Sequence, residues 1–138
     1  MPLSYHCPKC DALLNPNVRV VLIARHSKRS GIVLMSSKLG EYQVICDKGF
    51  CHDVDKGDTI DFCCPVCTES LTSDSHENFA ELKIVNSERA DHEPCLLRFS
   101  RISEEQATFL YDGDTVKAFG AESGAFRDEM KIEGDWGW

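Results

Sequence analysis

Two short cysteine motifs are the strongest chemical feature of this sequence. "YHCPKC" contains Cys7 and Cys10, and "FCCPVC" contains Cys64 and Cys67. In a Cys-Pro-x-Cys turn the two sulfurs lie close enough to bind one ion, and backbone N–H groups that point at the sulfurs ease their negative charge. Two such turns supply the four thiolates of a tetrahedral zinc site, with zinc–sulfur distances of about 2.3 Å. The motifs therefore predict that these four cysteines bind one zinc ion.

The same motifs resemble the knuckles of zinc-ribbon and rubredoxin-like proteins, in which each Cys-Pro-x-Cys turn lies on a β-hairpin. The resemblance is limited to the knuckles, and it implies either a closed structural zinc site or iron in the same four-cysteine site with a role in electron transfer. Those families favour glycine directly after the second cysteine, whereas this chain has Asp11 and Thr68. Because a β-branched residue fits a left-handed backbone poorly, we expect the second knuckle to be less regular than the first.

A second group of potential ligands lies outside the two motifs. Cys46, Cys51, His52 and Cys63 are candidates for another metal site, for structural filling, or for a reversible redox pair formed by Cys46–Cys51 or Cys51–Cys63. The sequence contains no phosphate-binding glycine loop and no serine-centred nucleophile motif, and its histidines are scattered. We therefore predict no catalytic residues and no enzyme activity.

The elements that must position the cysteines are predicted to be short strands in two related halves. Aligning the two motifs gives an offset of 57 residues, which also matches Leu14 with Leu71. Further along, "GDTIDF" matches "GDTVKAF" at an offset of 56, and the runs "IVLMSS" and "EYQVIC" match "CLLRFS" and "QATFLY" in the same order. We predict a mostly β, zinc-ribbon-like fold that arose by internal duplication, each half being a knuckle followed by an antiparallel β-meander.

This reading divides the chain into three parts. Residues 1–62 form the first knuckle and repeat, residues 63–120 form the second, and residues 121–138 form an acidic tail that ends in Trp136 and Trp138. From Ser37 to Gly57 is 20 positions, whereas the matching step from Ser100 to Gly113 is 13, so the first half has seven extra residues, which fall at 46–56. We expect this inserted loop, with its cysteines and histidine, to protrude from the sheet and to have a role.

Composition limits the class of partner. The chain has 23 acidic and 15 basic side chains and a net charge of −8, which argues against nucleic acid as the main partner. We interpret the basic run "RHSKRS" as a solvated hairpin turn. An alternative function for the protein, nucleic-acid binding by a zinc ribbon, would depend on this run. No apolar run approaches the roughly 20 residues that span a bilayer, and no secretory signal is apparent. We therefore expect a cytoplasmic zinc-binding protein that acts as a protein-interaction or regulatory module.

Overall fold

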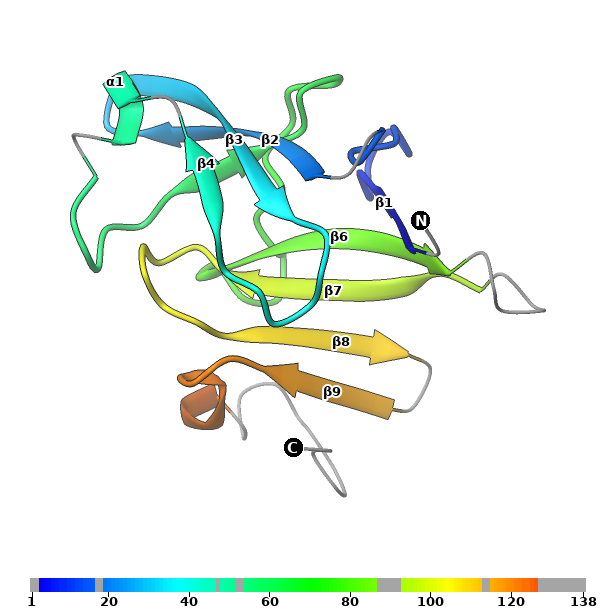
Figure 1. Cartoon of the computed structure of the whole chain (residues 1–138). Coiled ribbons are helices and arrows are strands. Elements are labelled where there is room, and N and C mark those ends of the chain that lie inside the picture. The colour runs from blue at the N-terminus through cyan, green and yellow to red at the C-terminus, as the bar shows by residue number, and fades with distance from the viewer. Residues whose placement is uncertain are drawn as a thin grey trace.

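The computed structural model describes residues 3–16, 19–46, 48–51, 54–86, 93–112 and 115–126. Within these ranges the chain is mostly β and forms two antiparallel sheets (Figure 1). The strands are β1 (Leu3–His6), β2 (Arg19–His26), β3 (Arg29–Ser36), β4 (Val44–Cys46), β5 (Asp61–Cys63), β6 (Phe79–Asn86), β7 (Cys95–Ser100), β8 (Thr108–Asp112) and β9 (Thr115–Phe119). Two short helices, α1 (Lys48–Cys51) and η1 (Ser123–Phe126), accompany them. None of the described helices has the length and apolar character needed to cross a membrane.

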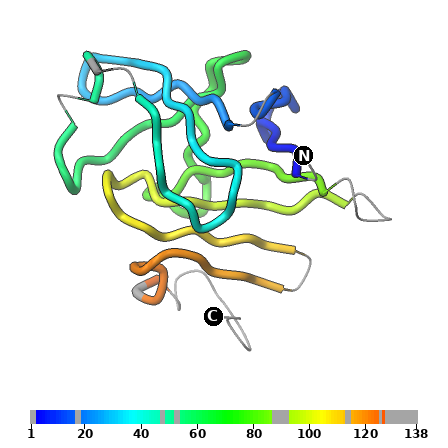
Figure 2. Tube along the Cα trace, viewed as in Figure 1, coloured from blue at the N-terminus to red at the C-terminus, as the bar shows by residue number. Residues whose placement is uncertain are grey.

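The strands that precede the two knuckles, β1 and β5, lie at the edges of different sheets. The five-stranded sheet has the order β1-β6-β7-β8-β9, and the four-stranded sheet has the order β4-β3-β2-β5. Strand β1 pairs with β6, which places Tyr5 opposite Ile84, while β5 pairs with β2, which places Phe62 opposite Ala24. In Figure 2 the blue N-terminal segment lies beside the green segment that contains β6. Strand β1, from the predicted half 1–62, thus pairs with a strand of the predicted half 63–120, whereas β5 spans the predicted boundary and pairs with β2 of the first half.

The apolar runs that match in sequence occupy matching places in the two sheets. Strand β3 lies between β2 and β4, and β7 lies between β6 and β8. The two GDT segments, in contrast, lie in different places: the first leads into β5, at the edge beside β2, whereas the second contributes β9, at the edge beside β8. The predicted correspondence of these two segments is wrong, because "DTIDF" returns the chain to the second knuckle and "TVKAF" extends the sheet.

The main core lies between the inner faces of the two sheets. Side chains alternate along β2, so that Val20, Leu22 and Ala24 are buried against the five-stranded sheet while the residues between them face outward. The rings of Phe62 and Phe99 meet across the core with their centroids 5.3 Å apart.

Tyr5 spans this core from the edge of the five-stranded sheet. Its hydroxyl donates a hydrogen bond of 2.5 Å to the backbone carbonyl of Ser37, which follows the last residue of β3. Burial raises the pKa of Tyr5 to about 12. The phenol therefore stays neutral, and its hydrogen bond fastens the first strand of the chain to the opposite layer.

A second, smaller apolar cluster covers the outer face of the five-stranded sheet. It contains the buried residues Phe79, Ala107, Phe109 and Ala118. Phe126 of η1 packs edge-on against Phe79, with ring centroids 5.1 Å apart. This cluster gives β8 and β9 a core that does not depend on contacts with the four-stranded sheet.

Candidate metal centre

The first cysteine knuckle is a tight turn that follows β1. The backbone N–H of Asp11 donates to the carbonyl of Cys7 at 2.9 Å, and that of Cys7 donates to Ala12 at 3.0 Å. Two further N–H groups, from Lys9 and Cys10, point at the Cys7 sulfur at 3.3 and 3.4 Å. Such donors favour the thiolate over the thiol, because they stabilise negative charge on the sulfur.

The second knuckle repeats this turn bond for bond after β5. Thr68 donates to the carbonyl of Cys64 at 2.9 Å, and the N–H of Cys64 donates to Glu69 at 3.1 Å. The N–H groups of Val66 and Cys67 approach the Cys64 sulfur at 3.3 and 3.5 Å. The expectation of a less regular second knuckle is therefore wrong: the hydrogen bonds hold the backbone in the same conformation in spite of the β-branched residue.

The two knuckles bring four sulfur atoms together, as the sequence predicted. The sulfurs of Cys7, Cys10, Cys64 and Cys67 all lie within 4.8 Å of one another. Across the knuckles, Cys7 lies 3.8 Å from Cys67, and Cys10 lies 3.7 Å from Cys64. Sulfurs at about 2.3 Å from a tetrahedral ion are separated by about 3.8 Å. The cluster thus has the size and the donor set to hold one metal ion.

Burial disfavours the charged thiolate form of Cys7 when no cation is bound. Cys7 and Cys64 have no exposed surface, whereas Cys10 is exposed. Burial raises the pKa of the Cys7 thiol to about 12, and the N–H groups of Cys10 and Lys9 offset only part of this rise. Near pH 7 the protein without metal therefore keeps this thiol protonated, and binding a divalent ion releases the proton.

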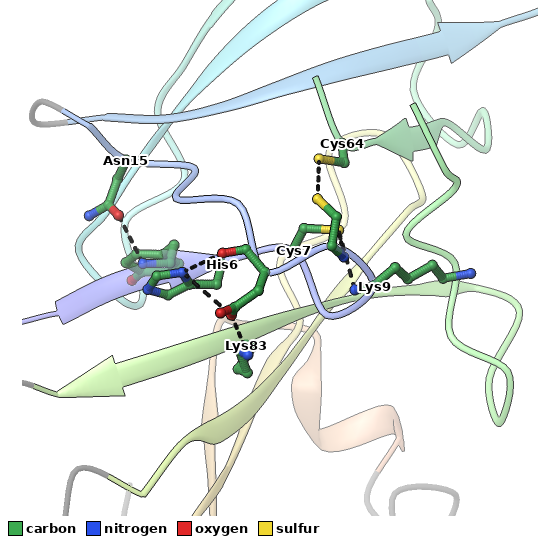
Figure 3. A network of polar contacts seen from close by, with 9 residues as sticks. His6, Cys7, Lys9, Asn15, Cys64 and Lys83 are labelled. Atoms are coloured by element: carbon green, nitrogen blue, oxygen red, sulfur yellow. Dashed lines mark hydrogen bonds and ion pairs between the residues drawn. The ribbon is translucent and has the colours of Figure 1, made fainter. Parts of the chain in front are cut away.

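Polar residues outside the motifs hold the first knuckle in place, and the sequence alone did not identify them. Asn15 accepts a hydrogen bond from the backbone N–H of Tyr5 at 2.8 Å and donates one to the carbonyl of Leu3 at 3.0 Å. Asp11 forms an ion pair with Lys83 of β6, and the carbonyl of Asp11 lies 3.1 Å from the His6 ring (Figure 3). His6 is engaged in this network and is not one of the clustered ligands.

A different network supports the second knuckle. The carboxylate of Asp61 accepts hydrogen bonds from the hydroxyls of Ser70 at 2.5 Å and Thr72 at 3.3 Å. These contacts join β5 to the segment that follows the knuckle. In each knuckle, side-chain hydrogen bonds therefore join the segment before the cysteine pair to the segment after it. The spacing of the cysteines does not predict these bonds.

Replacing Thr68 with Gly is expected to raise the free energy of unfolding by about 1 kcal/mol. Thr68 has a φ of 61°, in the left-handed region that a β-branched side chain strains to adopt, and glycine relieves this strain at some cost in unfolded-state entropy. Urea unfolding of the two proteins measures the difference. The matched control is Asp11→Gly, at a φ of 66°, which we expect to gain less because Asp tolerates this region and pairs with Lys83. A loss of stability in Thr68→Gly would contradict the strain argument.

The remaining candidate ligands do not gather into a second cluster. Cys46 and Cys51 form a disulfide, with their Cα atoms 6.2 Å apart. Cys63 lies on β5 and Cys46 on β4, at opposite edges of the four-stranded sheet. Cys63 is fully buried, and burial raises the pKa of its thiol. His52, Trp136 and Trp138 lie outside the described residues. Within the described ranges, the four-sulfur group is the only cluster of three or more potential ligands.

The inserted loop at 46–56 contains a helical turn that the sequence did not predict. Helix α1 runs from Lys48 to Cys51, so the disulfide joins its last residue to the end of β4. The side chain of Phe50 is only 3% exposed and belongs to the main core. Arg29 donates a hydrogen bond to the carbonyl of Gly49 at 3.2 Å. The described part of this loop is thus packed against the sheet.

A comparison of the chain with protein-family models, with curated proteins and with solved structures finds no match.

Proposed function

We propose that this chain is a small zinc-binding protein in which one zinc ion, held by Cys7, Cys10, Cys64 and Cys67, fastens the fold, and in which an exposed sheet face binds another protein. The observation that carries the metal assignment is the approach of four sulfurs to within 4.8 Å of one another. A complete four-sulfur shell leaves no open position for water, so the ion has a structural role and does not catalyse hydrolysis.

The position of the site explains why a structural ion is useful here. The first knuckle follows β1, at the edge of the five-stranded sheet, and the second follows β5, at the edge of the four-stranded sheet. One ion therefore ties together two edges that belong to different layers. Both edge strands are short, with four and three residues, and have limited pairing of their own. Metal binding supplies on the order of 10 kcal/mol in comparable sites, enough to decide whether such a fold forms.

An internal duplication is part of this proposal. Its support is the repetition of the knuckle hydrogen bonds at an offset of 57 residues, together with the reciprocal pairing of β1 with β6 and of β5 with β2. A fused pair of repeats that each formed half of one metal site would have this arrangement.

The protein-binding role rests on an apolar stripe across the outer face of the four-stranded sheet. Ile23 lies opposite Ile32, and Leu34 lies opposite Ile45, so these side chains share one face. Ile32 and Ile45 are 57% and 52% exposed. Arg25 continues the same face on β2 and is exposed, and Arg19 lies at the other end of that strand. A partner surface with apolar side chains bordered by carboxylates complements this stripe.

Two measurements test the two parts of the proposal. Elemental analysis of the purified protein is expected to give one zinc per chain. In a capture experiment from host lysate, we expect a discrete partner to be retained by the wild type and lost with Ile32→Asp. The control Leu13→Asp, a change of the same kind at a residue that is 47% exposed and lies outside the stripe, is expected to retain it. Equal capture by both variants, or by neither, would contradict the assignment of the stripe.

Electron transfer with iron in the same site is the second candidate, and one observation favours it. Cys10 is exposed, so one ligand of the cluster reaches the protein surface, where a redox partner can approach. Colour separates the two metals, because ferric tetrathiolate is red and zinc is colourless. Nucleic-acid binding has less support, because in the basic turn His26 pairs with Asp58 at 3.2 Å and Arg29 bonds to Gly49, in a chain with a net charge of −8.

A further inference from the structure

The molecule contains a cleft that the metal site and the apolar stripe do not use. It lies between the inner faces of the two sheets, with Val33 and Met35 of β3 on one wall and Leu97 and Phe99 of β7 on the other. Its volume is about 580 Å³. This falls within the range of about 300–1,000 Å³ that is typical of small-molecule sites.

The connection between β3 and β4 forms one rim of the cleft and is bonded to the opposite sheet. The Tyr42 hydroxyl lies 2.7 Å from that of Thr108 and donates to the carbonyl of Phe119 at 3.1 Å. Gly120, with a φ of 98°, makes this approach possible, since a Cβ there would lie 2.5 Å from the Tyr42 hydroxyl oxygen. Figure 1 shows the β3–β4 loop, in cyan, passing across β7 toward β8. This rim is therefore fixed in position before any ligand arrives.

Two further sides of the cleft are fastened in other ways. The segment before β5 is bonded to the segment after β7: Ile60 donates to Arg101 at 2.8 Å, and Ser103 donates to Asp58 at 2.7 Å. On the remaining side, the Cys46–Cys51 disulfide holds α1 against β4, and Phe50 of α1 lines the cleft. The cleft is thus bounded by segments joined through hydrogen bonds and a covalent bond, which is the property of a preformed site.

The chemistry of the walls defines the ligand. The polar groups within the cleft are bonded to the protein: Tyr5 to Ser37, Tyr42 to Thr108, and the guanidinium of Arg101 to the carbonyls of Ile60 and Glu77. The remaining charged side chains at the rim include both signs: Glu105 is half-buried and accepts a hydrogen bond from the Ser100 hydroxyl at 2.7 Å, and Lys38, Glu41 and Glu104 are exposed. A charged ligand would lose its hydration in this cleft without gaining a partner, which costs several kcal/mol. An uncharged, apolar molecule loses little and gains contact with both sheets.

We propose that this cleft is a binding site for a small, uncharged, apolar molecule, and that the Cys46–Cys51 disulfide keeps its Phe50 wall in place. The inference is independent of the metal assignment, because none of the four clustered cysteines lines the cleft.

Fluorescence titration with the neutral probe N-phenyl-1-naphthylamine tests the site on the full chain with its metal bound. We expect saturable binding of one probe per chain. Leu39, a half-buried residue of the cleft, is replaced by Asp to add a charge and by Trp to fill the space. Each variant is expected to weaken binding about tenfold or more. The control Leu13→Asp adds the same charge at a residue that is 47% exposed and does not line the cleft, and it is expected to bind within about twofold of the wild type.

The double variant Cys46→Ser, Cys51→Ser examines the wall. We expect it to weaken probe binding several-fold, because without the disulfide part of the binding free energy is spent on ordering the segment that contains Phe50. Thermal melts and metal content of every variant confirm that the fold is retained. Three results would overturn the proposal: probe binding that does not saturate, probe binding that is unchanged in both Leu39 variants, or probe binding that disappears when the chain self-associates. The last result would identify a second copy of the chain as the occupant of the cleft.

Discussion

Replacing Cys64 with Ser is expected to lower the free energy of unfolding by several kcal/mol. Cys64 is fully buried, its sulfur accepts two backbone N–H groups, and it lies 3.7 Å from Cys10 of the other knuckle. A serine oxygen is a poor replacement for a thiolate ligand, so the variant loses metal affinity, and lost binding energy becomes lost folding energy. Thermal and urea unfolding, each with and without a strong chelator, measure the effect.

The matched control for this prediction is Cys63→Ser. Cys63 is the adjacent residue and is equally buried, but its sulfur lies outside the cluster and contacts Asp61 at 3.7 Å. We expect it to retain one metal per chain and to lose only about 1 kcal/mol. Chelator should lower the melting temperature of the wild type and of Cys63→Ser, and should leave Cys64→Ser unchanged. If chelator removes the metal from the wild type and its melt does not move, the ion is not structural, and the electron-transfer function gains support.

Replacing Phe79 with Ala is expected to lower the free energy of unfolding by about 3–5 kcal/mol without loss of the metal. Phe79 is 1% exposed and packs between Phe109 and Phe126, with ring centroids 5.9 and 5.1 Å away. Removing the ring leaves a cavity in the smaller cluster, on the face of the five-stranded sheet that lies away from the cysteines.

Urea unfolding together with metal analysis measures this second effect. Ile32→Ala is the control, since Ile32 is 57% exposed and its truncation should change stability by no more than about 0.5 kcal/mol. Loss of metal from Phe79→Ala under native conditions would show that the two clusters are not independent.

The four-cysteine cluster was predictable because the local chemistry is contained in a few adjacent residues. Cys-Pro-x-Cys sets the distance between two sulfurs within one turn, so Cys7 pairs with Cys10 and Cys64 with Cys67 wherever the chain goes. The mostly β character was predictable for a similar reason, because alternation such as that of Val20, Leu22 and Ala24 is a local pattern.

The arrangement of the strands in two sheets was not predictable in this way. A sequence match assigns β1 to the half in which it occurs, whereas its pairing with β6 places it in the other sheet through long-range contacts such as Tyr5 with Ile84. The supporting residues Asn15, Asp61 and Lys83 were also not predicted. Their partners are a backbone group or a side chain nine or more positions away in the sequence, and no motif specifies such a contact. The cleft forms between the two sheets, from residues that are distant in sequence, so no short sequence pattern predicts it.

X-ray absorption spectroscopy at the metal edge of the purified protein identifies the bound ion and counts its ligands. We expect one zinc per chain with four sulfur neighbours at about 2.3 Å and no light-atom ligand. A first shell that includes nitrogen or oxygen at about 2.0–2.2 Å, or a protein that carries no stoichiometric metal, would contradict this expectation.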